Sequence, residues 1–335
     1  MAVSMLSTSE IRAALDARGS RQQELFAEAR RLRDKHFARS IVLRGVIEVT
    51  NVCRVNCDYC PMRRDNTRYN DRYFMSSDEI VQRAREIHEA GIDVILLQGG
   101  EAPRVLAAVK EAIAAIKELY GGRVEVLLNL GSLTRDQYSE LRQAGATSYI
   151  LKHETSDAAL HEQVRGETLE SRLESLRDLL DLGYKVGTGF ISDLPGQRIE
   201  SIVDDIELAG RLGVHMCSVS PFAPAPDTPL ADQPSGSLDL ALNSIACLRI
   251  CYPHLLIPSV SALEKADSGG QARGLEAGAN VLTINFTAES DRQRYLIYGK
   301  NRFVVRMQHV QEIVRNAGLG IRGSIFLPDG AGRPA

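Results

Sequence analysis

The chain is 335 residues long, carries a formal net charge of −3 at pH 7 and is 44% hydrophobic. This length suits two average domains or one α/β barrel, because barrels run long as single domains. A charge so close to neutral argues against nucleic acid and membranes as partners, and no apolar run approaches the ~18 residues of a membrane-spanning helix. Since there is no basic-then-apolar signal segment, we expect a cytoplasmic protein whose six cysteines stay reduced.

The first expected element is a helix over residues 7–38. Ser7 and Glu10 have the spacing of a capping box, and apolar residues recur behind them at roughly helical intervals. We assign residues 1–40 to an N-terminal helical extension that caps the rest of the chain.

Strands and helices then alternate. The expected strands are 43–50, 93–98, 124–129, 148–152, 185–191, 215–220, 255–258 and 280–284. The expected helices are 76–90, 104–119, 134–145, 157–163, 168–182, 199–212, 238–252, 269–276 and 301–317. The strand segments are short and rich in Val, Ile and Leu, which is typical of parallel strands buried on both faces.

Eight strand–helix units predict a (β/α)8 TIM barrel over residues 41–320, followed by a C-terminal tail over 321–335. An open, doubly wound sheet is the alternative. In a barrel, the loops at the carboxyl ends of the strands carry the chemistry. Motifs far apart in the sequence are therefore expected to meet at one rim.

Three cysteines follow the first strand directly, with the spacing Cys53-x3-Cys57-x2-Cys60. Three thiolates can hold three irons of a cubane iron–sulfur cluster, which normally takes four cysteines. The next cysteine is Cys217, so one iron would stay open for chemistry. A three-cysteine zinc site with a distant histidine is an alternative. A disulfide with a spare thiol is disfavoured because nothing marks the chain as secreted.

Two other strand ends carry candidate binding residues. Gly99-Gly100-Glu101 follows the second strand, where glycines let the backbone approach a ligand, although a plain turn explains them as well. Glu154 follows the fourth strand and can accept hydrogen bonds from ribose hydroxyls or an ammonium group. Arg172 can clamp a carboxylate. A surface ion pair of these two residues is the alternative.

Taken together, these stretches resemble the radical S-adenosylmethionine (radical SAM) superfamily. Its signature is the triple-cysteine spacing with an aromatic residue before the last cysteine, here Tyr59. Within the superfamily, the chain resembles the biotin synthase-like branch, most of all the HydE-type [FeFe]-hydrogenase maturases and then the methylornithine synthases. The similarity is carried by residues 51–60, 63–66, 97–101, 153–155, 194–197, 221–222, 226–230 and 278–280.

The resemblance implies that Cys53, Cys57 and Cys60 hold a [4Fe–4S] cluster whose fourth iron is chelated by S-adenosylmethionine (SAM). It implies SAM contacts from Tyr59, Gly99, Gly100, Glu101, Glu154 and Arg172. A flavodoxin- or ferredoxin-type donor would supply the electron that cleaves SAM to a 5′-deoxyadenosyl radical, which acts on a small substrate inside the barrel. From strand-end positions, we expect substrate contacts from Lys152, Thr188, Ser218, Ser220, Ser259 and Ser261.

The remaining cysteines bear on the alternatives. No cysteine lies between Cys60 and Cys217, which disfavours sulfur insertion of the biotin synthase kind, since that reaction uses a second cluster inside the barrel. Cys247 and Cys251 share a helix face and could hold a second cluster with Cys217. They could equally be buried core thiols. A non-enzymatic iron–sulfur or zinc scaffold would need the cysteine loop but not Glu101, Glu154 and Arg172.

Overall fold

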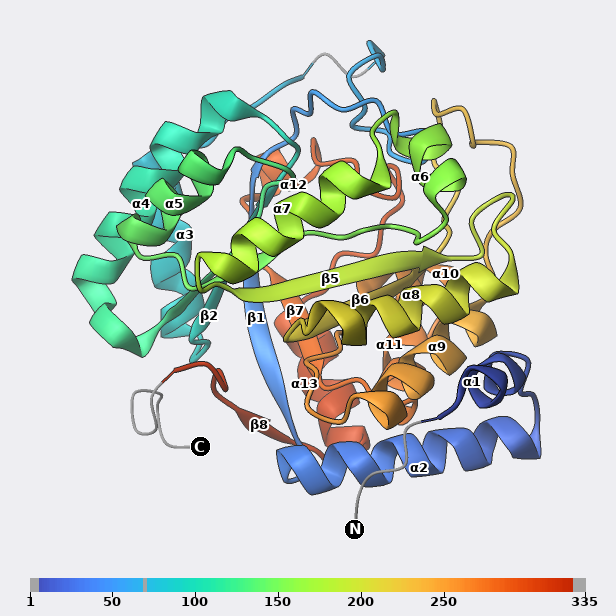
Figure 1. The fold of residues 1–335 in the computed structure, drawn as a ribbon. Helices are drawn as coiled ribbons and strands as arrows, with labels where there is room; N and C mark the ends of the chain where they lie inside the picture. The colour runs from blue at the N-terminus through green and yellow to red at the C-terminus, as the bar shows by residue number, and fades with distance from the viewer. Residues whose placement is uncertain (1–5, 69–70, 328–335) are drawn as a thin grey trace.

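A parallel sheet in the order β6-β5-β4-β3-β2-β1-β7 forms the centre of the molecule (Figure 1). The computed structural model describes residues 6–68 and 71–327. The strands are β1 (Ser40–Thr50), β2 (Val94–Gly99), β3 (Glu125–Asn129), β4 (Ser148–Ile150), β5 (Lys185–Ser192), β6 (Met216–Pro221) and β7 (Val281–Asn285).

The expected seventh strand, 255–258, bridges the two ends of this sheet. On one side the Leu256 N–H donates to the His215 carbonyl at 3.1 Å, next to β6. On the other side the Ser259 N–H donates to the Val281 carbonyl of β7 at 2.9 Å. Isolated parallel bridges form on both sides, so the ring of hydrogen-bonded segments closes. The predicted barrel is confirmed, with one of its eight members reduced to this short bridging segment.

Helices surround the sheet, and the three predicted capping boxes at Ser7, Ser76 and Thr134 are all present. Two short helices, α10 (Ser261–Ala266) and α12 (Glu289–Arg292), were not expected. The helices that follow the N-terminal pair are α3 (Ser77–Glu89), α4 (Leu106–Tyr120), α5 (Arg135–Ala144), α6 (Ala158–Arg165), α7 (Leu169–Asp181), α8 (Ile199–Leu212), α9 (Leu238–Cys251), α10 (Ser261–Ala266), α11 (Gly270–Glu276), α12 (Glu289–Arg292) and α13 (Met307–Asn316), with 3-10 turns at Pro103–Val105 and Gly121–Arg123.

Two expected helices have different bounds in the structure. The single helix expected over 7–38 is two helices, α1 (Thr8–Leu15) and α2 (Ser20–Phe37), because Gly19 has φ 60 and ψ −129, a conformation open mainly to glycine. The last helix begins at Met307 rather than 301. Arg306, just before this helix, has an extended backbone conformation. The preceding residue, Val305, accepts a hydrogen bond from the Asn285 N–H at the end of β7.

The N-terminal helices and the last described strand lie on the amino-terminal side of the barrel. In Figure 1, α2 lies at the start of β1 and α1 lies beside α2 and α9, away from the loop that holds the cysteines. The tail expected from residue 321 begins inside a further strand, β8 (Gly320–Arg322), which pairs with β1. Beyond it the Ser324 N–H donates to the Asp93 carboxylate at 3.0 Å. The carboxyl-end rim is therefore the open side.

Asn243 of α9 ties the N-terminal helices to the barrel. Its buried amide donates to the carbonyls of Leu15 and Ala17, at 2.9 and 3.0 Å. We expect Asn243→Ala to lower the free energy of unfolding by about 2 kcal/mol, because it leaves buried carbonyl groups without a donor. Denaturant unfolding measures the change. The exposed substitution Asn301→Ala is the control and should stay within about 0.5 kcal/mol of the parent. Equal midpoints for the two variants would contradict the prediction.

Candidate active site

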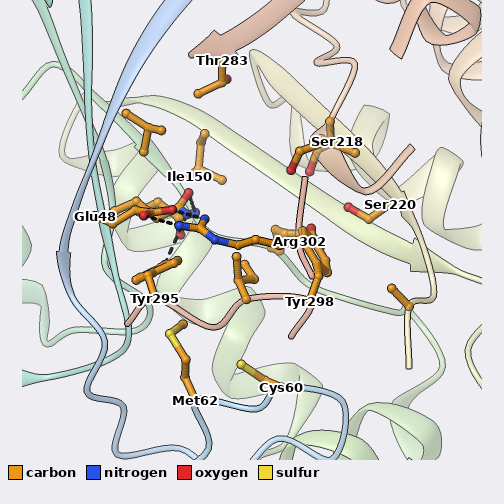
Figure 2. A pocket seen from close by; sticks show the side chains of 18 of the residues that line it. Glu48, Cys60, Met62, Ile150, Ser218, Ser220, Thr283, Tyr295, Tyr298 and Arg302 are labelled. Carbon is orange, nitrogen blue, oxygen red and sulfur yellow. Dashed lines mark hydrogen bonds and ion pairs between the residues drawn. The ribbon is translucent and has the colours of Figure 1, made fainter. Parts of the chain in front are cut away.

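The carboxyl ends of the strands enclose a cavity of about 330 Å³ (Figure 2). Its wall brings together side chains from all parts of the barrel. Figure 2 shows Cys60 and Met62 at one end of the cavity, with Arg302 reaching toward Glu48 in its middle. The sequence-predicted residues that line it are Cys53, Cys57, Tyr59, Cys60, Gly99, Gly100, Glu101, Lys152, Glu154, Arg172, Ser218, Ser220, Ser259 and Ser261.

Thr188 is the one predicted site residue that does not line the cavity. It is 1% exposed, and its hydroxyl donates to the Leu151 carbonyl at 3.0 Å. The same oxygen lies 2.9 Å from Nδ1 of His153. Its hydroxyl is therefore bonded inside the protein, and the structure does not bring Thr188 to the cavity with the other candidate residues.

The cysteine loop is attached to two neighbouring elements. The Asp58 N–H donates to the Val164 carbonyl in the last turn of α6, and the Arg54 N–H donates to the Glu101 carbonyl, both at 2.8 Å. All six cysteines of the chain are free thiols, so the disulfide alternative is wrong. Burial raises the pKa of Cys53, and it raises the pKa of Cys57 to about 11. Because thiolates bind metals, loading iron at these thiols must release protons.

Gly100 lets the end of β2 lie directly against the cysteine loop. A Cβ atom at this position would overlap the Val52 carbonyl and stand 2.8 Å from Cβ of Cys53. A Cβ at Gly99 would also be tight, 3.0 Å from Cγ2 of Thr50. The two glycines therefore allow the end of β2 to pack closely against the backbone that leads into the cysteine loop, which a plain turn would not require.

Three guanidinium groups surround two carboxylates beside the loop. Arg165 and Arg172 donate to Oε1 of Glu101 at 3.2 and 3.3 Å, and to Glu167 at 3.1 and 3.2 Å. Arg54 lies 3.0 Å from Oε2 of Glu101. Burial favours the neutral form of Glu167, but Arg165 and Arg172 outweigh it and lower its pKa. The group carries one positive charge in excess.

Several polar atoms in this network are buried without a hydrogen bond. They include Oε2 of Glu101, which is near Arg54 but not in hydrogen-bonding geometry, and Nε of Arg165 and Arg172. Buried polar groups are ordinarily satisfied. Unused donors and acceptors together with an excess positive charge fit a ligand that brings both an ammonium and a carboxylate group, as the methionyl end of SAM does.

Glu154 has a left-handed backbone conformation, with φ 65. The turn is held by hydrogen bonds from the Glu154 N–H to Gly189 and from the Ile191 N–H to the Glu154 carbonyl, at 3.0 and 2.8 Å. Strained backbone of this kind clusters at functional sites. Glu154 and Arg172 are both buried, at 8% and 3% exposure, so the surface-pair alternative is wrong.

Lys152 pairs with Glu154, its Nζ 3.0 Å from Oε2. Burial alone would raise the pKa of Glu154, but Lys152, Arg165 and Arg172 together hold it below the usual value. We expect Lys152→Met to lower the free energy of unfolding by about 2 kcal/mol at pH 7, because it leaves the buried Glu154 carboxylate without its partly buried lysine partner. A matched control is Lys110→Met, which breaks an exposed pair with Glu140 and should cost under about 1 kcal/mol.

The effect of Lys152→Met is also pH-dependent. A lowered folded-state pKa means that ionised Glu154 stabilises the fold above its unfolded pKa, and that this contribution is lost as the pH falls through the folded pKa. The cost of the substitution should therefore be full at pH 7 and shrink only in more acidic solution, as the pH falls through the lowered folded-state pKa of Glu154. A pH series of urea unfolding curves measures it. A cost that grows on acidification would refute the assignment.

The sequence patterns missed several residues of the wall. Arg165 ends α6 and lies at the centre of the charge network. Arg302 forms a two-pronged ion pair with Glu48 of β1, with Nη2 2.7 Å from Oε2 (Figure 2). Tyr295 lies under this pair. No local motif marks these residues, because their partners lie 64 and 254 positions away in the chain.

Cys217, Cys247 and Cys251 lie outside the cavity, buried in the core between the sheet and the outer helices. Within residues 6–68 and 71–327, no three His, Cys, Asp or Glu side chains converge as a single metal ion requires. The zinc alternative therefore has no compact one-ion site there. A cubane differs, because each of its cysteines binds a different iron.

Comparison with known proteins identifies the family. The profile of the radical SAM superfamily matches residues 47–209. The [FeFe] hydrogenase maturase subunit HydE of Thermotoga maritima is 40% identical over 277 residues, covering 82% of this chain and 79% of HydE. The chain belongs to the radical SAM superfamily. The chain is therefore an enzyme whose cofactors are a [4Fe–4S] cluster and SAM. Radical SAM enzymes act on small-molecule substrates and take their electron from a donor.

Other radical SAM relatives cover most of the chain. The 3-methylornithine synthase of Methanosarcina acetivorans is 27% identical, over 88% of this chain and 84% of its own length. A crystal structure of methylornithine synthase (PylB) has the same fold, with a TM-score of 0.83 over 95% of both chains at 24% identity. Among the described residues, no helix is both long and apolar enough to cross a membrane.

Proposed function

We propose that Cys53, Cys57 and Cys60 each bind one iron of the [4Fe–4S] cluster and leave the fourth iron to SAM. The three thiols are free, face one cavity and sit on one loop. Clusters of this type are held by cysteine thiolates, and three ligands leave one position open. The scaffold alternative does not account for the buried Glu101, Glu154 and Arg172 beside the thiols.

The charge network would bind SAM. We assign its ammonium group to Glu101 and the backbone at Gly99 and Gly100, and its carboxylate to Arg172. Glu154 would accept from the ribose hydroxyls, and Tyr59 would pack against the ligand. The observation that carries this assignment is the set of buried atoms without a hydrogen bond on Glu101 and Arg172, two residues that line the same cavity as the cysteines. Fixed ionic partners also orient the ligand before reaction.

The rest of the cavity would hold the substrate. When bound, the cluster and SAM supply a 5′-deoxyadenosyl radical by one-electron reductive cleavage. Lys152 offers a cation, and Ser218, Ser220 and Ser261 offer hydroxyls to a polar substrate. Ser259 also lines the cavity, but its hydroxyl donates to the Gln271 carbonyl at 2.8 Å. The Arg302–Glu48 pair crosses the cavity and, with Tyr295, closes part of its wall. Exclusion of water protects a reactive intermediate.

We further propose that the substrate reaction is that of a HydE-type [FeFe]-hydrogenase maturase, supported by the 40% identity over most of both chains. A methylornithine synthase-like mutase is the second candidate, supported by the fold match over 95% of both chains. Sulfur insertion is disfavoured because, among the described residues, the only cysteines that line the cavity are those of the loop.

We also propose that a flavodoxin- or ferredoxin-type protein donates the electron to the cluster, and that the protein is located in the cytoplasm.

The domain division stays a proposal as well. It consists of a helical extension over 1–40, the radical SAM barrel over 41–320 and a tail over 321–335. The hydrogen bonds from Asn243 to Leu15 and Ala17 show that the N-terminal helices pack against the barrel across the first boundary. The pairing of β8 with β1 attaches the start of the tail to the barrel.

Anaerobic reconstitution tests the proposal. The protein is loaded with iron and sulfide, reduced with dithionite and given SAM, and 5′-deoxyadenosine is measured together with bound iron. Product with about four irons per chain supports a single cluster, whereas about eight would revive the Cys217, Cys247 and Cys251 site. A full cluster without SAM binding would contradict the SAM assignment. Formation of 3-methylornithine would decide for the second candidate against the first.

A further inference from the structure

Arg165 joins the SAM network to the cysteine loop. Its side chain is 7% exposed. One terminal nitrogen donates to the Tyr59 hydroxyl at 3.4 Å, and the other donates to Glu101 and Glu167. Tyr59 stands immediately before Cys60. The residue before Arg165, Val164, accepts the backbone hydrogen bond from Asp58 of the loop. Backbone and side chain at the end of α6 therefore hold two adjacent loop residues, Asp58 and Tyr59, which lie between Cys57 and Cys60.

The guanidinium also brings a positive charge to the cavity, because Arg165 lines the same wall as Cys53, Cys57 and Cys60. Arg172 shares Glu101 and Glu167 with Arg165 but makes no hydrogen bond to Tyr59. Two buried arginines with the same carboxylate partners thus differ in their relation to the cysteines.

We propose that the charge of Arg165, whose guanidinium lies beside the cysteine loop in contact with Tyr59, raises the reduction potential of the bound cluster. The inference rests on the proposed function, in which the three cysteines hold that cluster. Reduction adds one electron from the donor, with no bond made or broken, so the site becomes more negative by one unit. A fixed positive charge in a poorly solvated cavity stabilises the reduced form. Net charge and hydrogen bonding are known determinants of cluster potentials.

The test is a redox titration of the reconstituted, SAM-free protein, followed by the electron paramagnetic resonance signal of the reduced cluster. We compare Arg165→Met with Arg172→Met, which removes the same charge from the same carboxylates but not from Tyr59. At a fixed solution potential, the ratio of reduced to oxidised cluster should fall about tenfold in Arg165→Met, equivalent to about 59 mV for one electron. In Arg172→Met it should change less than about threefold, because that guanidinium does not contact the loop.

Two more variants separate charge from packing. Arg165→Lys keeps the charge and should keep a potential close to that of the parent. Tyr59→Phe removes the hydroxyl and leaves the charge, so it should also keep the potential. If Arg165→Met fails to take up the cluster, Arg165→Gln keeps hydrogen-bond donors without the charge and should show the same drop.

The outcomes distinguish this inference from the proposed function. Equal midpoint potentials in the parent, Arg165→Met and Arg165→Gln, with a full complement of iron, would overturn the role of Arg165 and leave the cysteine assignment intact. An equal drop in Arg172→Met would overturn it too, because the effect would then belong to the general charge of the network. A parent protein that binds no cluster would instead overturn the proposed function.

Discussion

Cys57→Ala is expected to abolish 5′-deoxyadenosine formation and to remove most of the bound iron. Cys57 is buried at the centre of the loop and lines the cavity with Cys53 and Cys60. With only two thiolates left, the cluster loses a ligand that no nearby cysteine can replace, since the next one is Cys217. Even residues outside a metal's ligand shell cost 10–100-fold when mutated. Loss of a ligand should therefore cost more than ~10²-fold in product.

The matched control is Cys217→Ala, the same chemical change at a thiol buried in the core and outside the cavity. It should keep iron content and product formation and lose about 1 kcal/mol of stability from the missing volume. Iron, acid-labile sulfide and 5′-deoxyadenosine are measured in the same anaerobic samples. A Cys57→Ala protein that keeps four irons and full activity would contradict the site. A Cys217→Ala protein that loses half its iron would revive the second cluster.

Gly100→Ala is expected to weaken SAM binding by at least ~10²-fold. The new methyl group would overlap the Val52 carbonyl and press on Cys53, so the cysteine loop or the end of β2 must move. Neither can move freely, because the Arg54 N–H is bonded to the Glu101 carbonyl, one residue beyond Gly100. Displacements of about 1 Å at a site can cost 10²-fold.

Equilibrium dialysis of the reconstituted protein against labelled SAM measures this loss. Gly122→Ala is the control, because a Cβ there meets nothing within 4 Å and its backbone is not left-handed. Iron content is followed in parallel, since the moved loop also carries Cys53. If Gly100→Ala binds SAM as tightly as Gly122→Ala, the close approach of β2 to the loop has no part in binding.

Local signals in the sequence predicted the elements well. Each capping box needs residues only three apart, and all three formed. Where a local signal was weak, the prediction failed. Gly19 inside a helical pattern did not reveal that the chain turns there, and the extended stretch before α13 depends on a hydrogen bond to Asn285 at the end of β7.

Strand-end position was a good guide to the cavity but not to side-chain direction. Ser218 and Ser220 of β6 both line it, whereas Thr188 of β5 does not. Successive strand residues face opposite sides of the sheet, so a shift of one position reverses the prediction. Glycines at 187 and 189 flank Thr188 on the other face, where Gly189 packs against Ser218.

The sequence by itself determined the radical SAM signature, because three cysteines and an aromatic residue lie within eight consecutive positions and their spacing does not depend on the fold. Tertiary structure alone decided which charges meet that loop. Arg165 reaches Glu101 across 64 residues, and Arg302 reaches Glu48 across 254. Such partners are selected by burial, since an arginine taken out of water needs acceptors for its guanidinium group, and at these two positions the closed barrel supplies carboxylates. The composition of the chain does not show where that will be.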